Sequence, residues 1–349
     1  MPVFTAGKVT TLPIGVTTTL GLAEIRAALM TSGPDHATLT GGWASNDDTG
    51  SNLRQFNAAP PASDPILVPA TQTEPEHLLA RYYFWVRDAR AVADSGNATE
   101  QELHRLDAID VLVVESAPGT FIAVFSSRNV KELNLGSSHH GLDTTKPIGA
   151  LTSFESKIKA ADGRATVQHD RSPLAHQNAE FFLWLMERWR DQQQLEPRIR
   201  LVAVNGLNGQ DQSRRTTQLQ QDVDFYRVGL LTAIAESDTL GPVKVAFKDE
   251  IAGVKLDVEL FVDGGFAFHL GRSFYPNIIE KPLIRLTAVK DLVFTYIPVL
   301  RDLYANDTDW VNTRRAAFIH DAFIRLADRY KTDAGSAVCP HCGGDLQAA

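Results

Sequence analysis

Cysteine is almost absent from this chain of 349 residues. The two that occur, Cys339 and Cys342, lie close together near the C-terminus. A disulfide framework needs several cysteines spread over a secreted chain, so the composition argues against that class of protein. An isolated C-x-x-C pair is more typical of metal ligands in a reducing compartment, and we therefore expect a cytoplasmic protein.

Long apolar segments are also lacking. No stretch reaches the roughly 18 uncharged apolar residues that a membrane-spanning helix needs. Residues 1–20 contain one lysine and no apolar run of the kind found in signal peptides. With 44% hydrophobic residues, a chain of this length buries enough apolar surface to fold without a metal or a disulfide. We expect about two domains and no membrane span.

An excess of positive charge is missing as well. The chain has 34 lysines and arginines against 42 aspartates and glutamates, which gives a net charge of −8. A field of this sign repels a phosphate backbone unless basic side chains gather in one place. The arginines of 188–200 and of 314–329 are interrupted by acidic residues such as Asp191 and Asp321. Tight binding of duplex DNA by a monomer is therefore not expected, whereas a dimer would combine two such clusters.

Two familiar catalytic motifs are incomplete. The segment VNGLNGQDQSRRTTQ has glycines between a strand and a helix pattern, but lacks both the GK[ST] of a phosphate-binding loop and the G-x-G-x-x-G of a dinucleotide fold. Asp107, Asp110 and Glu115 surround a predicted hairpin, as the acids of restriction-type nucleases do. The next strand, FIAVFSSR, lacks the acid and the lysine that such a nuclease needs. We do not expect either activity.

The first 170 residues combine turn-rich and strand-forming segments. Residues 1–70 are rich in Thr, Gly and Pro and are expected to be irregular, with a short helix over 20–30. Apolar side chains recur every three to four residues within 78–86, which predicts a helix. Two β-branched and aromatic runs in 107–127 flank the sequence Ser-Ala-Pro-Gly. They predict a hairpin at the centre of an α+β domain over 71–170.

Residues 171–330 predict a second, helix-rich α+β domain. Ser172 and Pro173 are suited to begin a helix with a heavy aromatic face. The elements expected after it are a strand over 198–206 that ends at an Asn-Gly turn, a helix of about 217–236, a β-meander over 243–275 and closing helices of about 287–304 and 309–330.

Strands and helices are mixed without regular βαβ alternation. The sequence therefore predicts an α+β fold, with mixed or antiparallel sheets built from hairpins and packed against several long helices. Pro298 is expected to kink the first closing helix, and Asp307 or Thr308 to cap the second. A flexible tail over 331–349 should carry the C-x-x-C pair.

The tail sequence VCPHCGGDL resembles one half of a zinc-ribbon or rubredoxin-type knuckle. Thiolates at Cys339 and Cys342 suit one zinc ion, but a structural zinc site has four ligands. Three possibilities remain open: two tails share one zinc across a homodimer, histidines elsewhere complete the site, or the tail is a remnant without metal. Zinc is the cofactor that the resemblance implies.

The segment KLDVELFVDGGFAFHL contains a second candidate site. Apolar residues face apolar residues if a three-residue loop pairs Leu260 with Phe268. The same register places Glu259 opposite His269, with Asp257 on the same face. A carboxylate beside an imidazole suits acid/base catalysis or metal binding. The alternative is a solvated polar face with a weak cross-strand ion pair.

The loop GSSHHGLD offers a third, weaker candidate. His139, His140 and Asp143 follow the predicted hairpin, and loops on rigid strands often carry function. Adjacent histidines diverge on an extended backbone, so they bind one ion less readily than spaced histidines do. Exposed loop histidines without a function are the alternative interpretation.

These patterns favour a non-enzymatic binding or assembly protein over an enzyme. We expect a homodimer that works with other proteins in a bacterial multi-component system, such as phage defence or nucleic-acid handling. The alternative is a metal-dependent or acid/base-dependent hydrolase or nuclease. It would use the strand face of Asp257, Glu259 and His269, together with His139 or His140.

Overall fold

The computed structural model describes residues 8–44, 63–87, 99, 103–127, 149–168, 172–176, 178, 180–211, 216–220, 230–232, 234, 237–279 and 281–335. The chain divides into two compact units. The first comprises Met1–Ala175, Asp263–Gly271 and Asn277–Ile297, and the second comprises His176–Val262, Arg272–Pro276 and Pro298–Ala349.

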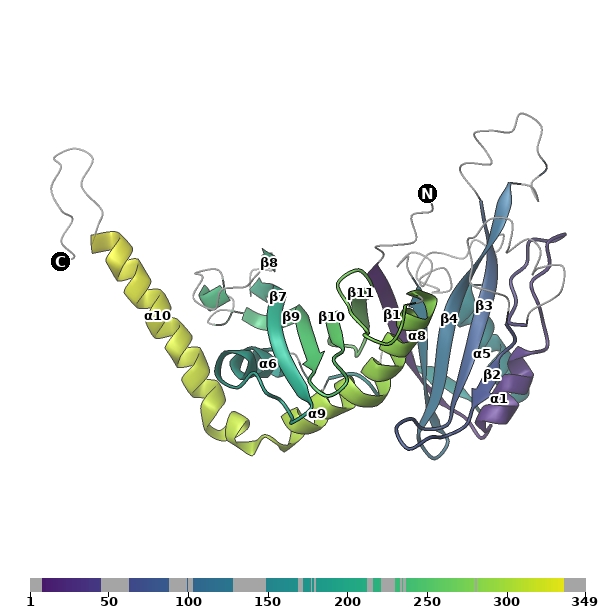
Figure 1. Ribbon diagram of the computed structural model, residues 1–349, viewed down its shortest axis with the longest axis horizontal. Coiled ribbons are helices and arrows are strands. Elements are labelled where there is room, and N and C mark those ends of the chain that lie inside the picture. The colour runs from purple at the N-terminus through teal and green to yellow at the C-terminus, as the bar shows by residue number, and fades with distance from the viewer. Residues whose placement is uncertain are drawn as a thin grey trace. The chain divides into compact units, whose positions relative to one another are not determined.

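The strands of the first unit pair in antiparallel fashion. They are β1 (Lys8–Thr17), β2 (Ile66–Val68), β3 (His77–Arg87), β4 (His104–Ala117), β5 (Thr120–Ser127), β6 (Thr166–Gln168) and β11 (Phe266–His269). Their order is β2-β3-β4-β5-β1-β11, and β6 pairs with the C-terminal end of β1. Figure 1 shows the long strands β3 and β4 side by side.

The hairpin predicted over 107–127 is confirmed by β4 and β5. Residues 111–114 and 121–127 are buried, so both faces of these strands are covered, as expected for β-branched and aromatic runs in a central position. Gly119 lies in the turn with a φ of 71°, a conformation that glycine adopts without a steric penalty.

β3 occupies the segment in which the apolar spacing predicted a helix, so that prediction is wrong. Residues 82–85, Tyr-Tyr-Phe-Trp, are all buried. Aromatic residues favour strands, and four consecutive buried positions suit a strand covered on both faces rather than one face of a helix. β3 pairs with β4 along its whole length, and its other edge is met by β2 and by Gly42.

Helices cover both faces of this sheet. On one face, α1 (Leu22–Leu29) and α5 (Ala150–Ala161) share a core with the even-numbered side chains of β3 and the odd-numbered side chains of β4. α1 confirms the short helix predicted over 20–30, and Figure 1 shows both helices beside β2 and β3. Because side chains alternate along a strand, the odd-numbered side chains of β3 and the even-numbered side chains of β4 lie on the opposite face. The helix α8 (Lys281–Asp291) lies over that face.

The second unit has its own antiparallel strands and a layer of helices. The strands are β7 (Ile199–Asp211), β8 (Thr216–Gln220), β9 (Ser237–Asp249) and β10 (Lys255–Leu260), in the order β10-β9-β7-β8. The helices are α6 (Glu180–Asp191), which packs on β7 and β9, α9 (Ile297–Asn306), the π-helical turn η3 (Trp310–Arg314) and α10 (Arg315–Gly335). The pairing of β9 with β10 confirms that part of the predicted meander, and the α+β class with antiparallel pairing is confirmed for the described residues.

Several boundaries differ from the prediction for local reasons. β7 continues through Asn205 and Gly206 because its bulged pairing with β9 extends beyond them. The predicted helix of about 217–236 is wrong at its start, where β8 pairs with β7, and helix is found only at 230–232 and 234 among the described residues of that range. Ser172 caps a turn, accepting a hydrogen bond from the amide of Leu174 at 3.1 Å, and α6 begins eight residues later.

The closing helices are longer and more interrupted than predicted. α8 begins at Lys281 and passes into a π-helical turn, η2 (Leu292–Tyr296), directly before Pro298. A π-helical turn relieves the contact that a proline ring makes with the preceding turn of an α-helix. Asp307 is confirmed as the cap of the last helical segment, since its Oδ1 accepts the amide of Trp310 at 3.1 Å. α10 runs to Gly335, inside the stretch from Lys331 that the sequence predicts to be a flexible tail.

No described helix combines the length and the apolar composition that a membrane crossing would require.

Candidate functional site

The first unit contains a cleft of about 380 Å³ between α8 and the strands. One wall is aliphatic, with Leu283, Leu286 and Val289 contributed by α8. Leu79 and Leu112 continue the aliphatic surface on the strands, and residues 63–66 close one side. This volume falls within the range of ordinary small-molecule pockets.

Strand register places a polar row next to this aliphatic surface. Arg81 of β3 lies opposite Asp110 of β4, and Asp110 lies opposite Ser126 of β5. Residues two apart on a strand share a face, so the row borders the Leu79–Leu112 pair. Three strands and one helix thus bring an apolar surface and a charged surface into one cleft.

Asp110 is shared by two guanidinium groups. Arg81 Nε donates to Asp110 Oδ1 at 2.6 Å, and Arg285 of α8 donates from Nη2 to Asp110 Oδ2. Burial alone would lower the pKa of Arg81, but the charge of Asp110 and the hydrogen bond to it outweigh burial and raise that pKa above its usual value. One carboxylate between two guanidinium groups, which keep their charge in proteins, gives the trio one net positive charge.

Arg285 is the most enclosed member of the trio. It is 5% exposed, and its Nε finds no hydrogen-bond partner among the described residues. A buried donor without a partner costs about 1–3 kcal/mol. The cleft therefore presents an apolar surface beside a largely buried cation, Arg285.

The strand candidate predicted from the sequence is largely covered. Asp257 and Glu259 are each 6% exposed, so the solvated polar face considered in the sequence is not what the structure shows. Glu259 lies opposite Lys244 on β9, and His269 lies opposite Lys8 on β1. β10 and β11 belong to different units, so the pairing of Leu260 with Phe268 and of Glu259 with His269 stays a prediction.

The other predicted site residues lie outside the described part of the chain. These are His139, His140 and Asp143 in the loop, and Cys339 and Cys342 in the tail. Among the residues that the structure does describe, no group of three His, Cys, Asp or Glu side chains is arranged to hold a metal ion. The predicted zinc site therefore stays a prediction.

A second charged cluster supports the helices of the second unit. Asp307 Oδ2 accepts hydrogen bonds from Trp184 Nε1 at 2.9 Å and from Arg188 Nη2 at 2.6 Å, and it also accepts one from Arg314. Asp307 thereby joins α6 to the start of the last helical segment. The cluster connects α6 with the helical segment that follows Asp307, and we interpret it as structural.

The pH dependence of stability tests whether the ionised carboxylate of Asp307 stabilises this cluster. Burial raises the pKa of Asp307, but hydrogen bonds from Trp184 and Arg188 outweigh it, and the pKa lies below its usual value. A carboxylate with a lowered folded-state pKa stabilises the fold above its unfolded pKa of about 3.9, and this contribution disappears as the pH falls through the folded value. We expect the unfolding free energies of wild type and Asp307→Asn to differ most at about pH 7 and to differ less at about pH 3.

Urea unfolding at the two pH values measures this difference. Asp309→Asn, at an exposed position two residues away, is the matched control and should behave like wild type. If Asp307→Asn lowers the free energy of unfolding equally at both pH values, the ionised carboxylate does not stabilise this cluster.

Another conspicuous surface of the second unit lies along α10. Phe318, Ala322 and Leu326 pack inward, and Asp321 and Arg325 lie along one flank of this buried face, where Asp321 accepts a hydrogen bond from Arg190 of α6. The other flank carries a stripe without charge, which we call the α10 stripe; Ile319 in it is half-buried and its other members are exposed. Its members are Ala316, Ile319, Phe323, Ala327 and Tyr330.

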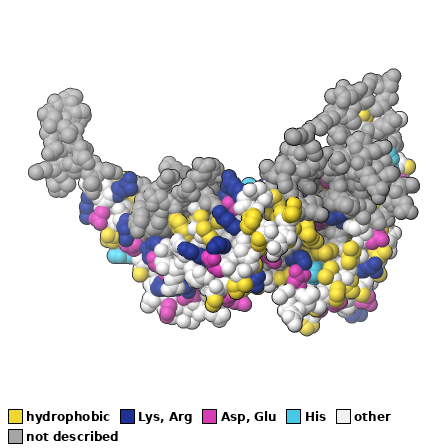
Figure 2. Space-filling view, in the orientation of Figure 1, with side chains coloured by type: hydrophobic (Ala, Val, Ile, Leu, Met, Phe, Trp, Pro, Cys, Tyr) yellow, Lys and Arg dark blue, Asp and Glu magenta, His cyan; other side chains and the backbone are white. Residues whose placement is uncertain are grey.

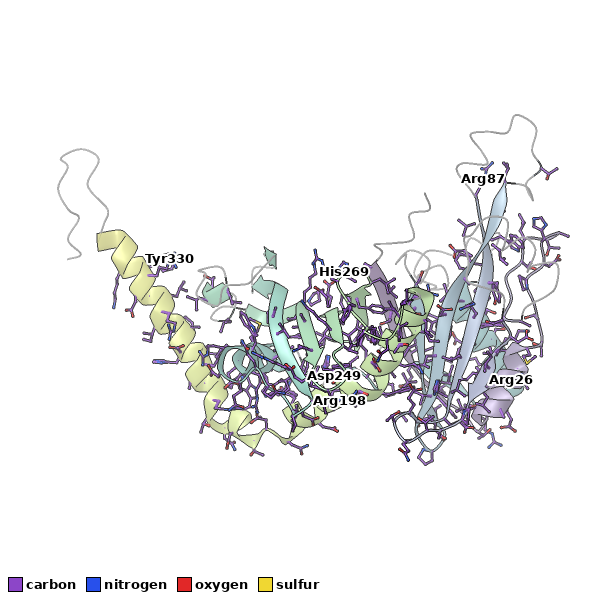
Figure 3. All side chains as sticks on the ribbon, in the orientation of Figure 1. Arg26, Arg87, Arg198, Asp249, His269 and Tyr330 are labelled. Atoms are coloured by element: carbon purple, nitrogen blue, oxygen red, sulfur yellow. The ribbon has the colours of Figure 1, made fainter. Side chains whose placement is uncertain are left out.

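The stripe follows helical geometry. Its members are spaced three, four, four and three residues apart, which places them on one side of an α-helix. Phe323 is 48% exposed and Tyr330 is 59% exposed. Figure 3 shows Tyr330 near the C-terminal end of α10. In Figure 2, acidic and basic side chains are interspersed along the part of α10 that faces the viewer, as the sequence predicted for its charged face.

In comparisons with known proteins, no family model matches the chain, and no curated protein matches it at a significant level. The function proposed below therefore depends on the geometry and chemistry of the chain itself.

Proposed function

We propose that this protein is a non-enzymatic binding and assembly component that forms a homodimer through α10. In the proposed dimer, the α10 stripe packs against the stripe of a second copy, and Cys339 and Cys342 of both copies hold one zinc ion. The observation that supports this proposal is an uncharged, exposed apolar stripe on the helix that leads directly to the only two cysteines.

The stripe has the pattern of a self-associating helix. Exposed aromatic residues contribute large apolar areas on burial, and the charged side chains of α10 lie on another side. Two identical stripes therefore meet without burying a charge. An isologous contact of this kind closes at two copies and leaves no free surface for further growth.

The position of the cysteines favours a parallel pair. Cys339 follows the last helical residue, Gly335, by four positions, and four residues reach at most about 14 Å. Packed parallel helices lie about 8–10 Å apart, so two such tails can meet at the end of the pair. In an antiparallel pair centred on Phe323, the two helix ends lie about 36 Å apart at 1.5 Å per residue, which exceeds the combined reach of both tails.

The shared zinc and the helix contact are expected to support each other. A single pair of short helical stripes is a small interface, in the class that gives weak association. A zinc ion with two thiolates has open positions, and a second copy completes a four-thiolate site. Each contact thus raises the effective concentration of the other.

A charge placed in the stripe should separate the dimer. Phe323→Glu would bring two carboxylates together in an apolar contact, and we expect the molar mass measured by light scattering at micromolar concentration to fall to that of a monomer. Ile251→Glu is the matched control, because Ile251 is 80% exposed in a turn of the same unit. It should leave the mass unchanged.

The proposal fails if wild type is a monomer with or without zinc, or if Ile251→Glu separates the dimer as well as Phe323→Glu does. The melting temperature of both variants should stay near that of wild type, because both positions are exposed. A role beside other proteins in a bacterial system, such as phage defence or nucleic-acid handling, remains a hypothesis from the sequence. The hydrolase alternative also remains a hypothesis, but it would require a substrate to reach carboxylates that are 6% exposed.

A further inference from the structure

The cleft of the first unit has no place in the proposed dimer, and its chemistry is specific. We propose that it binds a small organic carboxylate with an apolar body, and that Arg285 holds the carboxylate. This inference is independent of dimerisation through α10, which belongs to the other unit.

The shape and lining of the cleft determine which kind of ligand body fits. Leu283, Leu286 and Val289 on one side and Leu79 and Leu112 on the other enclose about 380 Å³. Binding sites of this size are mostly apolar, with a few polar groups that fix the orientation of the ligand. An aliphatic or aromatic body fits that surface, whereas a sugar or a nucleotide would leave many polar groups unpaired.

The charge inside the cleft determines which head group the ligand should carry. Asp110 is one carboxylate between Arg81 and Arg285, so the three side chains together carry one net positive charge. The remaining carboxylate on the cleft wall, Asp64, lies at an exposed position on the rim and has an interaction of its own. A singly charged head balances the inner charge, whereas a phosphate dianion would introduce an excess of negative charge.

Arg285 is the residue with an unused donor. It is 5% exposed, and its Nε is unpaired within the described part of the chain. The next cation along α8, Lys290, is already held by both oxygens of Glu74 at 2.7 Å. Arg285 lines the cleft, and a ligand carboxylate bound there would accept a charge-assisted hydrogen bond from its guanidinium group, which is the stronger class of such bonds.

Calorimetric titration of the full chain with octanoate, octanol and octyl phosphate tests this inference. We expect octanoate to bind and to raise the melting temperature of the first unit. Octanol, which has the body without the charge, should bind at least about ten-fold more weakly, because it lacks the charge-assisted hydrogen bond. Octyl phosphate should also bind more weakly than octanoate. Octanol or octyl phosphate binding as tightly as octanoate would overturn the assignment of the head group.

Two variants assign the site. Arg285→Gln should weaken octanoate binding at least about ten-fold. Arg164→Gln makes the same change at an exposed position of the same unit and should leave binding unchanged. Leu286→Trp fills the cleft without altering a charge and should abolish binding even if Arg285→Gln fails to fold. Failure of octanoate to bind wild type at millimolar concentration, or wild-type affinity in Leu286→Trp, would overturn the proposal.

Discussion

Replacing Asp110 by alanine is expected to lower the free energy of unfolding of the first unit by about 3–5 kcal/mol. The change removes the carboxylate that lies between Arg81 and Arg285, and Arg285 is 5% exposed. Two guanidinium groups would then lie near each other without that carboxylate in a largely enclosed place. Equilibrium unfolding in urea, followed by circular dichroism, measures the loss.

Two further substitutions serve as controls for that result. Asp110→Asn keeps an acceptor of similar shape and should cost less than Asp110→Ala, because hydrogen bonding is partly preserved while the charge is lost. Asp302→Ala removes a carboxylate from an exposed position of α9, and such a change should stay within about 0.5 kcal/mol. Equal effects of Asp110→Ala and Asp302→Ala would contradict the role assigned to the trio.

Replacing Trp184 by alanine should cost the second unit about 3–5 kcal/mol, the range for removal of a large aromatic side chain from a core. Trp184 is fully buried and lies 5.7 Å from the ring of Phe181 and 5.6 Å from that of Tyr304. Its indole N–H also donates to Asp307 at 2.9 Å. The variant would therefore open a cavity and remove one of the bonds that join α6 to the last helical segment.

Trp184→Phe separates these two contributions, because it keeps a ring and loses the N–H group. We expect it to cost about 1–2 kcal/mol, which is the scale of one hydrogen bond with a charged partner. Trp189 lies on the same helix and is only half-buried, so Trp189→Ala should cost clearly less than Trp184→Ala. A larger effect at Trp189 would show that the core of this unit is placed elsewhere.

The sequence predicted those elements in which local pattern and tertiary environment agree. The β4–β5 hairpin was predictable because β-branched runs flank a turn with a glycine, and Gly119 has a φ of 71° in that turn. β3 was not, because five apolar positions among its residues happen to fit a helical spacing while Tyr82–Trp85 are buried on both faces of a sheet. An unbroken aromatic run was the signal that favoured a strand.

The cleft could not be found from the sequence for the same reason. Arg81 faces Asp110 only if its segment is a strand in register with β4. Arg285 comes from a helix 175 residues farther along the chain than Asp110. Asp110 attracted notice as an acid beside a hairpin, but no pattern in the sequence links it to either arginine.

The α10 stripe could have been predicted from the sequence, but only the charged residues of this helix were considered. The ion pair of Asp321 and Arg325 confirms the mixed charges that the sequence predicted for this helix. The spacing of Phe323, Ala327 and Tyr330, on the side of the helix opposite that pair, was equally visible. Their exposure was not, because it depends on which face of α10 packs against the rest of its unit.

Native mass spectrometry of the full chain, before and after removal of metal by a chelator, tests whether the protein forms a zinc-bridged dimer. We predict a dimer with one zinc ion per two chains, loss of that zinc in Cys342→Ser, and a weaker dimer once zinc is gone. The unfolding transition of the body should change little, because a chain of this length does not depend on a metal to fold. A monomer that carries its own zinc, or a chain that remains a monomer with zinc present, would contradict the account.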